Sequence, residues 1–220
     1  MKIGVLGSGL VGETIASALI DKGHMVRMGS RSAANEKAKA WVDRSADLAS
    51  QGDFNDAAGF GEIVFLCLNG AFALDAVKSI EPANLQGKIV VDLTNPLDFT
   101  QGMPPRILEG MGNSNSLGEE IQKALPQALV VKTLNTLNCK VMVEPQLVGN
   151  GNHSLFVCGN NEDARNKVKH FLVDQFGWKP ESLIDLGAIS SARGMEAYVP
   201  FWVMLMQSLG TPLFNIRIVK

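Results

Sequence analysis

The sequence has few cysteines, few aromatic residues and almost no imbalance of charge, and these shortages exclude several classes of protein. The 220 residues carry a formal net charge of −2, which offers no basic surface to a nucleic acid or to an anionic membrane. Aromatic residues make up 6% of the chain, which further weakens any mechanism based on stacking against bases. We therefore expect no nucleic-acid partner.

The three cysteines, Cys67, Cys139 and Cys158, lie far apart and form no C-x-x-C pair. An odd number of isolated thiols fits a reducing compartment, so we expect a cytoplasmic protein. No histidine lies near them at ligand spacing, and no metal site is expected. The chain also lacks a run of roughly 20 apolar residues, the length a membrane span needs, so we expect no membrane partner.

Strand-like runs alternate with helical patterns along the chain, which predicts a parallel sheet with crossover helices. Short apolar or extended runs predict strands over 2–6, 25–28, 63–68, 88–93, 128–133, 153–158 and 183–186. Apolar residues at helical spacing predict helices over 10–22, 33–50, 71–80, 117–124, 161–176 and 190–209. The predicted fold class is α/β, a Rossmann-type doubly wound, mostly parallel sheet with a small carboxyl-terminal α/β extension.

A G-x-G-x-x-G motif follows the first predicted strand and opens the first predicted helix, which is the context that gives this motif its meaning. Its residues are Gly7, Ser8, Gly9, Leu10, Val11 and Gly12. The first glycine makes a tight turn, the second lets the backbone approach a pyrophosphate, and the third lets helix and strand pack closely. Free N–H groups at the start of the helix then face the anion. A glycine turn without a ligand is the weaker alternative.

The residues after the second predicted strand indicate which dinucleotide is bound. An NAD site normally has an acidic residue about 20 positions after the glycines, and it accepts a hydrogen bond from the ribose 2′-hydroxyl. This chain has Gly29-Ser30-Arg31-Ser32 there, without an acid. Arg31 can pair with a 2′-phosphate and Ser30 can donate to it, with Lys37 as a third contact. These residues predict NADP, against the alternative that Arg31 and Lys37 are ordinary surface side chains.

Three further loops follow predicted strands, at the edge of the sheet where ligands bind in this fold. Leu68 and Asn69 are expected to border the cofactor diphosphate and ribose. Asn95 and Pro96 are expected to approach the nicotinamide ribose. The polar run 132–138 suggests the nicotinamide end and the acceptor pocket, with Asn135 and Asn138 as the candidate residues on the substrate side. Plain turns at strand ends are the alternative for each loop.

The chain offers no clear set of acid and base residues for reducing a carbonyl, which needs a proton delivered to oxygen. Its single tyrosine, Tyr198, is not part of a Tyr-x-x-x-Lys pair, which argues against a short-chain alcohol dehydrogenase. Hydride transfer onto a flavin-like ring depends mainly on stacking and distance. The sequence therefore favours such an acceptor, and no catalytic residue is predicted.

Five segments together resemble one family, the NADP oxidoreductases that use the deazaflavin coenzyme F420, to which the cytosolic reductase domain of the STEAP metalloreductases also belongs. The likeness runs over nearly the whole chain. The segments that carry it are 2–12, 29–31, 131–136, 156–161 and 187–193, the last followed by a long helix. The glycine loop is common to many families, whereas Gly-Ser-Arg together with the Val-Cys-Gly segment and the short tail is more selective.

The resemblance implies a Rossmann domain with a small carboxyl-terminal domain, assembled as a homodimer. It also implies that NADP contacts residues 8–11, Ser30, Arg31 and Lys37, with the acceptor ring stacked over the nicotinamide. Asn135 and Asn138 replace a His and a Pro of the family pattern. The acceptor therefore stays open between a deazaflavin, an ordinary flavin, a quinone and another small molecule.

We expect residues 1–150 to form the NADP-binding domain and residues 151–220 a small domain for dimerisation or acceptor binding, unless the tail extends the same sheet. The expected function is hydride transfer between NADP(H) and a flavin or deazaflavin. An imine or hydroxy-acid reductase of the pyrroline-5-carboxylate or β-hydroxyacid type is one alternative, although those enzymes usually have a longer helical tail. A non-catalytic NADP-binding redox sensor is another.

Overall fold

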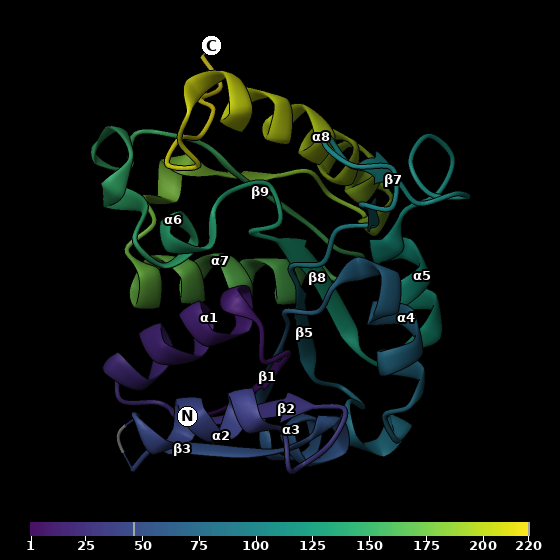
Figure 1. Ribbon diagram of the computed structural model, residues 1–220, viewed down its shortest axis with the longest axis vertical. Coiled ribbons are helices and arrows are strands. Elements are labelled where there is room, and N and C mark those ends of the chain that lie inside the picture. The colour runs from purple at the N-terminus through teal and green to yellow at the C-terminus, as the bar shows by residue number, and fades with distance from the viewer. Residues whose placement is uncertain (46, 220) are drawn as a thin grey trace.

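The computed structural model describes residues 1–45 and 47–219, and these form a twisted eight-stranded sheet with helices on both faces (Figure 1). The strands are β1 (Lys2–Leu6), β2 (Met25–Ser30), β3 (Ala49–Asp53), β4 (Ile63–Leu66), β5 (Ile89–Asp92), β8 (Leu129–Thr133), β9 (Leu155–Cys158) and β10 (Leu183–Asp185). Their order is β10-β9-β8-β5-β4-β1-β2-β3. Neighbours run parallel except β8 and β9. The predicted Rossmann-type sheet is confirmed.

The strand order places the ligand edge of the sheet. The chain winds outward from β1 to β2 and β3 on one side, and from β4 to β5 and β8 on the other. The direction of winding reverses between β1 and β4, and ligands of such sheets bind at the carboxyl ends of the strands on either side of that point. Leu6 pairs with both Gly29 and Leu66, so the loops after β1, β2 and β4 leave the sheet together.

The helices cover both faces of the sheet because its central strands are apolar on both sides. The helices are α1 (Leu10–Asp21), α2 (Glu36–Asp43), α3 (Phe54–Phe60), α4 (Gly70–Lys78), α5 (Leu117–Ala124), α6 (Cys139–Val143), α7 (Glu162–Phe176) and α8 (Ala192–Leu209). In Figure 1, α1, α6 and α7 lie on one side of β5 and β8, with α4 and α5 on the other. Phe65 belongs to the first apolar cluster and Leu66 to the second, as alternating side chains must.

The single helix predicted over 33–50 is wrong. Asn35 caps α2 by accepting from the N–H of Ala38, and the helix ends at Asp43. The edge strand β3 and the short helix α3 follow. Asp53 and Asp56 form a reciprocal capping box that starts α3 immediately after the strand. The predicted helix therefore ran beyond the end of α2 and into the first two residues of β3.

The segment after residue 150 contributes β9 and β10 to the same sheet, while the division into two domains at that point stays a prediction. A separate antiparallel pair, β6 (Leu97–Asp98) and β7 (Arg106–Ile107), lies in the loop between β5 and α5. Short 3-10 turns occupy 82–84, 145–147, 149–151, 180–182 and 189–191. Within the described residues, no helix has both the length and the apolar character that a membrane crossing requires.

Candidate functional site

The glycine loop between β1 and α1 has the geometry that its three glycines predict. Gly7 has a φ of +126°, and a Cβ there would lie 2.4 Å from the carbonyl oxygen of Cys67. A Cβ on Gly12 would lie 1.9 Å from the carbonyl oxygen of Gly7. A Cβ on Gly9 would meet nothing within 4 Å. Gly7 and Gly12 are therefore required by the fold, whereas Gly9 leaves an open face on the loop.

Helix α1 begins at this open face with unsatisfied backbone donors. Its N-cap is Gly9, which provides no side-chain cap. The first turn therefore presents free N–H groups and the positive end of the helix dipole. Leu10 is 72% exposed beside them, and Ser8 and Val11 are partly exposed. An anion such as a pyrophosphate fits this position.

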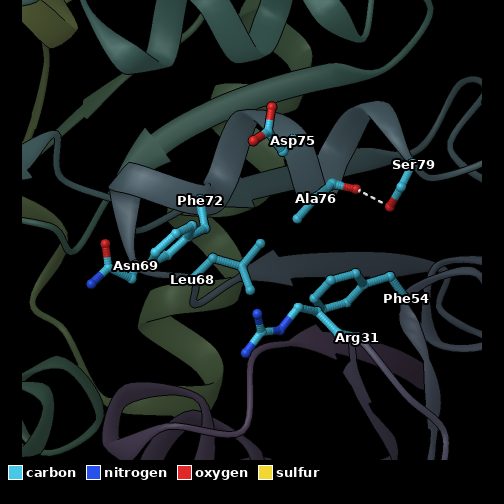
Figure 2. A pocket seen from close by; sticks show the side chains of 8 residues that line it. All are labelled: Arg31, Phe54, Leu68, Asn69, Phe72, Asp75, Ala76 and Ser79. Carbon is cyan, nitrogen blue, oxygen red and sulfur yellow. Dashed lines mark hydrogen bonds between the residues drawn. The ribbon is translucent and has the colours of Figure 1, made fainter.

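A cavity of about 510 Å³ lies next to the end of β2. Figure 2 shows Arg31, directly after β2, facing Leu68 across the cavity, while Asn69 and Phe72 border it from the start of α4. The guanidinium of Arg31 has no hydrogen-bond or ion-pair partner among residues 1–45 and 47–219. Asp75 also borders the cavity, but its carboxylate points away from Arg31 in this view. The cavity therefore offers one unpaired cation to a ligand.

The other residues predicted near Arg31 are arranged differently. Ser30 is 4% exposed, and its hydroxyl donates to the carbonyl oxygen of Ser32 at 2.7 Å, so donation elsewhere needs this bond to break. Lys37 lies in the first turn of α2 and is exposed. Asp53 is the register partner of Ser30, but its carboxylate accepts from the N–H of Asp56 as part of the cap of α3. The carboxylate of Asp53, the acid opposite Ser30 on β3, is therefore already used as a helix cap.

The loops after β5 and β8 meet through a pair of asparagines. Asn95 Nδ2 donates to the carbonyl oxygen of Asn135 at 2.8 Å, and Asn135 Nδ2 donates to Asn95 Oδ1 at 2.9 Å. Asn135 is 4% exposed, and within the described part of the chain its Oδ1 has no hydrogen-bond partner. The pair therefore keeps one buried acceptor available, which suits a ligand that carries an N–H or O–H donor.

The remaining predicted residues have structural contacts of their own. Asn69 and Asn138 cap α4 and α6 by accepting from the N–H groups of Ala71 and Lys140. The carbonyl oxygen of Pro96 accepts from the N–H of Leu108 at 2.8 Å, which ties the β6–β7 loop back to this edge of the sheet. Asn135 thus has a free acceptor, whereas the side-chain oxygen of Asn138 is already used.

A buried group of charges lies directly behind the asparagine pair, and the sequence interpretation did not include it. Lys132 Nζ lies 2.7 Å from Asp92 Oδ2 and 2.9 Å from Glu196 Oε1, and all three side chains have no exposed surface. Burial lowers the pKa of Lys132, but the two carboxylates outweigh it and hold the pKa above its usual value. The signal in the sequence was a charge at the carboxyl end of each of two apolar strands, Ile-Val-Val-Asp and Leu-Val-Val-Lys.

The thiols near the site are not prepared for nucleophilic chemistry. Cys67 lies against the glycine loop, and burial raises the pKa of its thiol far above the usual value. Burial likewise raises the pKa of Cys158 to about 12. Both thiols are therefore protonated at neutral pH, and neither is a nucleophile in this structure.

Comparison with known proteins connects this geometry to one family. The family model for NADP oxidoreductase, coenzyme F420-dependent, matches residues 2–96. A crystal structure provisionally assigned as an F420-dependent NADP reductase of Arthrobacter sp. FB24 is 41% identical, covers 100% of both chains and has a TM-score of 0.92. Metalloreductase STEAP3 of Rattus norvegicus is 27% identical over 91% of this chain and 38% of the relative. The chain thus spans less than two fifths of that curated relative.

More distant structures share the fold alone. A reductive aminase of Aspergillus terreus, solved with NADPH and ethyl levulinate, is 16% identical, covers 95% of this chain and 62% of the other, and has a TM-score of 0.65. Identity at this level carries no information about substrate.

Proposed function

The chain belongs to the family of coenzyme F420-dependent NADP oxidoreductases, and from that premise we propose that it transfers hydride between NADP(H) and a flavin or deazaflavin acceptor. One observation carries the proposal: the guanidinium of Arg31, which has no partner among residues 1–45 and 47–219, borders a cavity at the end of β2, where NAD enzymes place an acid. A 2′-phosphate would supply the negatively charged partner that Arg31 lacks among the described residues.

The described residues fit NADP along the ligand edge of the sheet. The glycine loop would hold the pyrophosphate at the start of α1 with Gly7, Ser8, Gly9, Leu10, Val11 and Gly12. Arg31, with Ser30 and Lys37 beside it, would hold the 2′-phosphate. Leu68 and Asn69 would border the adenosine ribose and diphosphate, while Asn95 and Pro96 would lie at the nicotinamide ribose.

When bound, NADPH supplies the hydride, and the residues of this chain position it. The free Oδ1 of Asn135 would accept a hydrogen bond at the nicotinamide end, which fixes the orientation of the ring. Asn138 would border the acceptor. No proton needs to be delivered by a side chain if the acceptor is a flavin-like ring, so binding and alignment account for the catalysis.

We also propose that the chain functions as a homodimer in the cytoplasm. The cytoplasmic part rests on three free cysteines, which fit a reducing compartment. The dimer rests on large apolar side chains that are exposed on α8 and directly after it, namely Phe201, Met204, Leu209 and Leu213. Sedimentation equilibrium would measure the mass of the particle, and a monomer at micromolar concentration would count against the dimer.

Charge reversal at Arg31 tests the choice of cofactor. We expect Arg31→Glu to lose roughly 1.5–3 kcal/mol of NADPH binding free energy, with little loss for NADH, because only NADPH carries the 2′-phosphate. Calorimetric titration of both cofactors gives the two values. Lys39→Glu is a matched control, since Lys39 is exposed on α2 and has no proposed contact with the cofactor. Equal losses for NADPH and NADH would refute the role of Arg31.

The acceptor is tested by turnover. NADPH oxidation is followed by absorbance with a deazaflavin, FMN, a ferric chelate and pyrroline carboxylate in parallel. Turnover with the deazaflavin or FMN supports the proposal. Turnover with the imine alone would indicate an imine reductase, and no turnover despite tight NADPH binding would indicate a redox sensor.

A further inference from the structure

We propose that Lys132, Asp92 and Glu196 act together as positioning residues, which hold the loops after β5 and β8 so that Asn95 and Asn135 receive the nicotinamide half of the cofactor. This inference rests on the proposed function, because it concerns the same dinucleotide site. It assigns a role to a buried charged cluster that itself has no surface from which to touch a ligand.

The cluster fixes the loop after β5 through the backbone and the hydroxyl of Thr94. Lys132 Nζ donates to the carbonyl oxygen of Thr94 at 2.8 Å. Asp92 Oδ1 accepts from the N–H of Thr94 at 2.8 Å and from its hydroxyl at 2.6 Å. Thr94 immediately precedes Asn95, so these three bonds set the direction in which the Asn95 side chain leaves the sheet.

The loop after β8 is strained and needs support. Leu134 is fully buried and has a φ of +63°, a left-handed conformation that is unfavourable for a residue with a branched side chain. This turn directs Asn135 toward Asn95, and Asn135 Nδ2 also reaches the carbonyl oxygen of Met195 at 3.4 Å. Lys132 lies on β8, which ends at Thr133 directly before Leu134, so the cluster holds the base of this loop.

The cluster also attaches α8 to the start of α5. Glu196 Oε2 accepts from the N–H of Leu117 at 2.8 Å, and Oε1 accepts from the N–H of Gly118 at 2.9 Å. A carboxylate at the start of α5 is favoured by the helix dipole. Glu196 therefore joins α8, the start of α5 and the Lys132 ammonium at one point, directly next to Met195.

Burying such a cluster costs free energy, and stability alone therefore does not account for it. Removing charges from water costs several kcal/mol per ion, and well-packed apolar residues of similar volume are often as stable or more so. What the charges add is direction, since an ammonium held by two carboxylates and a carbonyl oxygen has one well-defined position. The cluster lies at the end of the sheet from which the loops with Asn95 and Asn135 leave, and we infer that it aligns these two side chains.

The cluster should affect the binding of the nicotinamide half of the cofactor and not that of the adenosine half. Among residues 1–45 and 47–219, no hydrogen bond links the cluster to Arg31 or to the glycine loop. Loss of the cluster should therefore weaken NADPH binding but leave the affinity for adenosine 2′,5′-bisphosphate, which has only the adenosine half, nearly unchanged. A cluster that merely stabilised the fold would not distinguish the two ligands.

The variants are Lys132→Met, Glu196→Gln and Thr94→Val, and calorimetry gives the dissociation constant of each for NADPH and for adenosine 2′,5′-bisphosphate. Thr94→Val removes one hydrogen bond and keeps the shape, so it remains informative if Lys132→Met fails to fold. The matched control is Gln122→Met. Gln122 makes three hydrogen bonds at the opposite end of β8, to the carbonyl oxygens of Leu125 and Ala128 and from the N–H of Val130.

We expect NADPH binding to weaken about tenfold or more in Lys132→Met, as for other residues that orient a binding group, and less in Thr94→Val. The bisphosphate should bind each variant within about twofold of the parent protein, and Gln122→Met should change neither ligand. Equal weakening of both ligands, or the same selective loss in Gln122→Met, would overturn the inference. A parent protein that binds neither ligand would instead refute the proposed function, and the inference with it.

Discussion

The adenosine and nicotinamide halves of the proposed NADP site use charge in opposite ways. At the adenosine half, Arg31 borders an open cavity and is unpaired within the described residues. At the nicotinamide half, Lys132 is fully buried and held by Asp92 and Glu196. The first charge is available to a ligand, and the second is already committed to the protein. Exposure and partners, rather than the presence of a basic residue, therefore indicate which lysine or arginine recognises a phosphate.

The halves also differ in how far apart their parts lie in the chain. The glycine loop and Arg31 belong to the first βαβ unit, so a short segment specifies them. At the nicotinamide half, Lys132 and Asp92 are 40 residues apart, and Glu196 and Leu117 are 79 apart. One half is assembled by local sequence, whereas the other exists only once the whole sheet and α8 have formed.

Removing each cation should show the largest difference between the halves. Lys132→Met leaves two buried carboxylates without their ammonium, and we expect it to lower the free energy of unfolding by about 3–5 kcal/mol. Arg31→Met removes a cation that has no partner in the described part of the chain, and it should change the free energy of unfolding by less than about 0.5 kcal/mol. Urea denaturation followed by circular dichroism measures both. Similar losses in the two variants would mean that the halves do not differ in this way.

Substitution within the glycine loop should show the next largest effect, and it separates fold from ligand inside the adenosine half. A Cβ on Gly12 would lie 1.9 Å from the carbonyl oxygen of Gly7, so we expect Gly12→Ala to cost about 1–3 kcal/mol of unfolding free energy. Gly9→Ala meets no atom within 4 Å and should unfold like the parent protein. It should nevertheless bind NADPH more weakly, because the open face is where the pyrophosphate would lie.

Thermal unfolding with and without NADPH measures both effects. Gly194→Ala is a control for the general effect of replacing a glycine outside this loop, because Gly194 lies on α8, has no positive φ and leaves room for a Cβ. If Gly9→Ala bound NADPH as well as the parent protein does, the pyrophosphate would have to lie elsewhere.

The same contrast explains how much could be predicted from the sequence. The glycine loop and Arg31 were recognisable because motif, strand and helix are contiguous, and local physics fixes their spacing. The sheet and most helices followed from apolar periodicity. Strand β3 was missed because Ala-Ser-Gln-Gly-Asp lies at the edge of the sheet and has no apolar face to produce a period of two.

The buried cluster was not predicted because its local signal, a charge at the carboxyl end of each of two apolar strands, does not say that the charges meet. Asp92 and Lys132 read as ordinary polar residues at strand ends, and Glu196 lies within an amphipathic helix. Their partnership depends on which strands are neighbours and on where α8 packs, which the sequence alone leaves undetermined. Asn135 was predicted at the substrate side from its position after a strand, but its pairing with Asn95 needed the fold.

The smallest expected effect concerns a second link between α5 and α8, which lies at the surface instead of in the core. Arg193 donates to both carboxylate oxygens of Glu119, at 2.8 and 2.6 Å, and this pairing, together with Ser116, holds the pKa of Glu119 below its usual value. A carboxyl with a lowered pKa in the folded state stabilises the fold above its unfolded pKa, and that contribution is lost as pH falls through the folded value.

Glu119→Gln should therefore be slightly less stable than the parent protein at pH 7, and the difference should shrink as the pH falls through the lowered pKa of Glu119. Glu120→Gln is the matched control, because Glu120 is the next residue of α5 and accepts from Asn115 instead of an arginine. Urea midpoints between pH 3 and 7 give the comparison. Because solvent and salt screen a surface pair, a difference as large as that of Lys132→Met would show that burial is not what separates the two links.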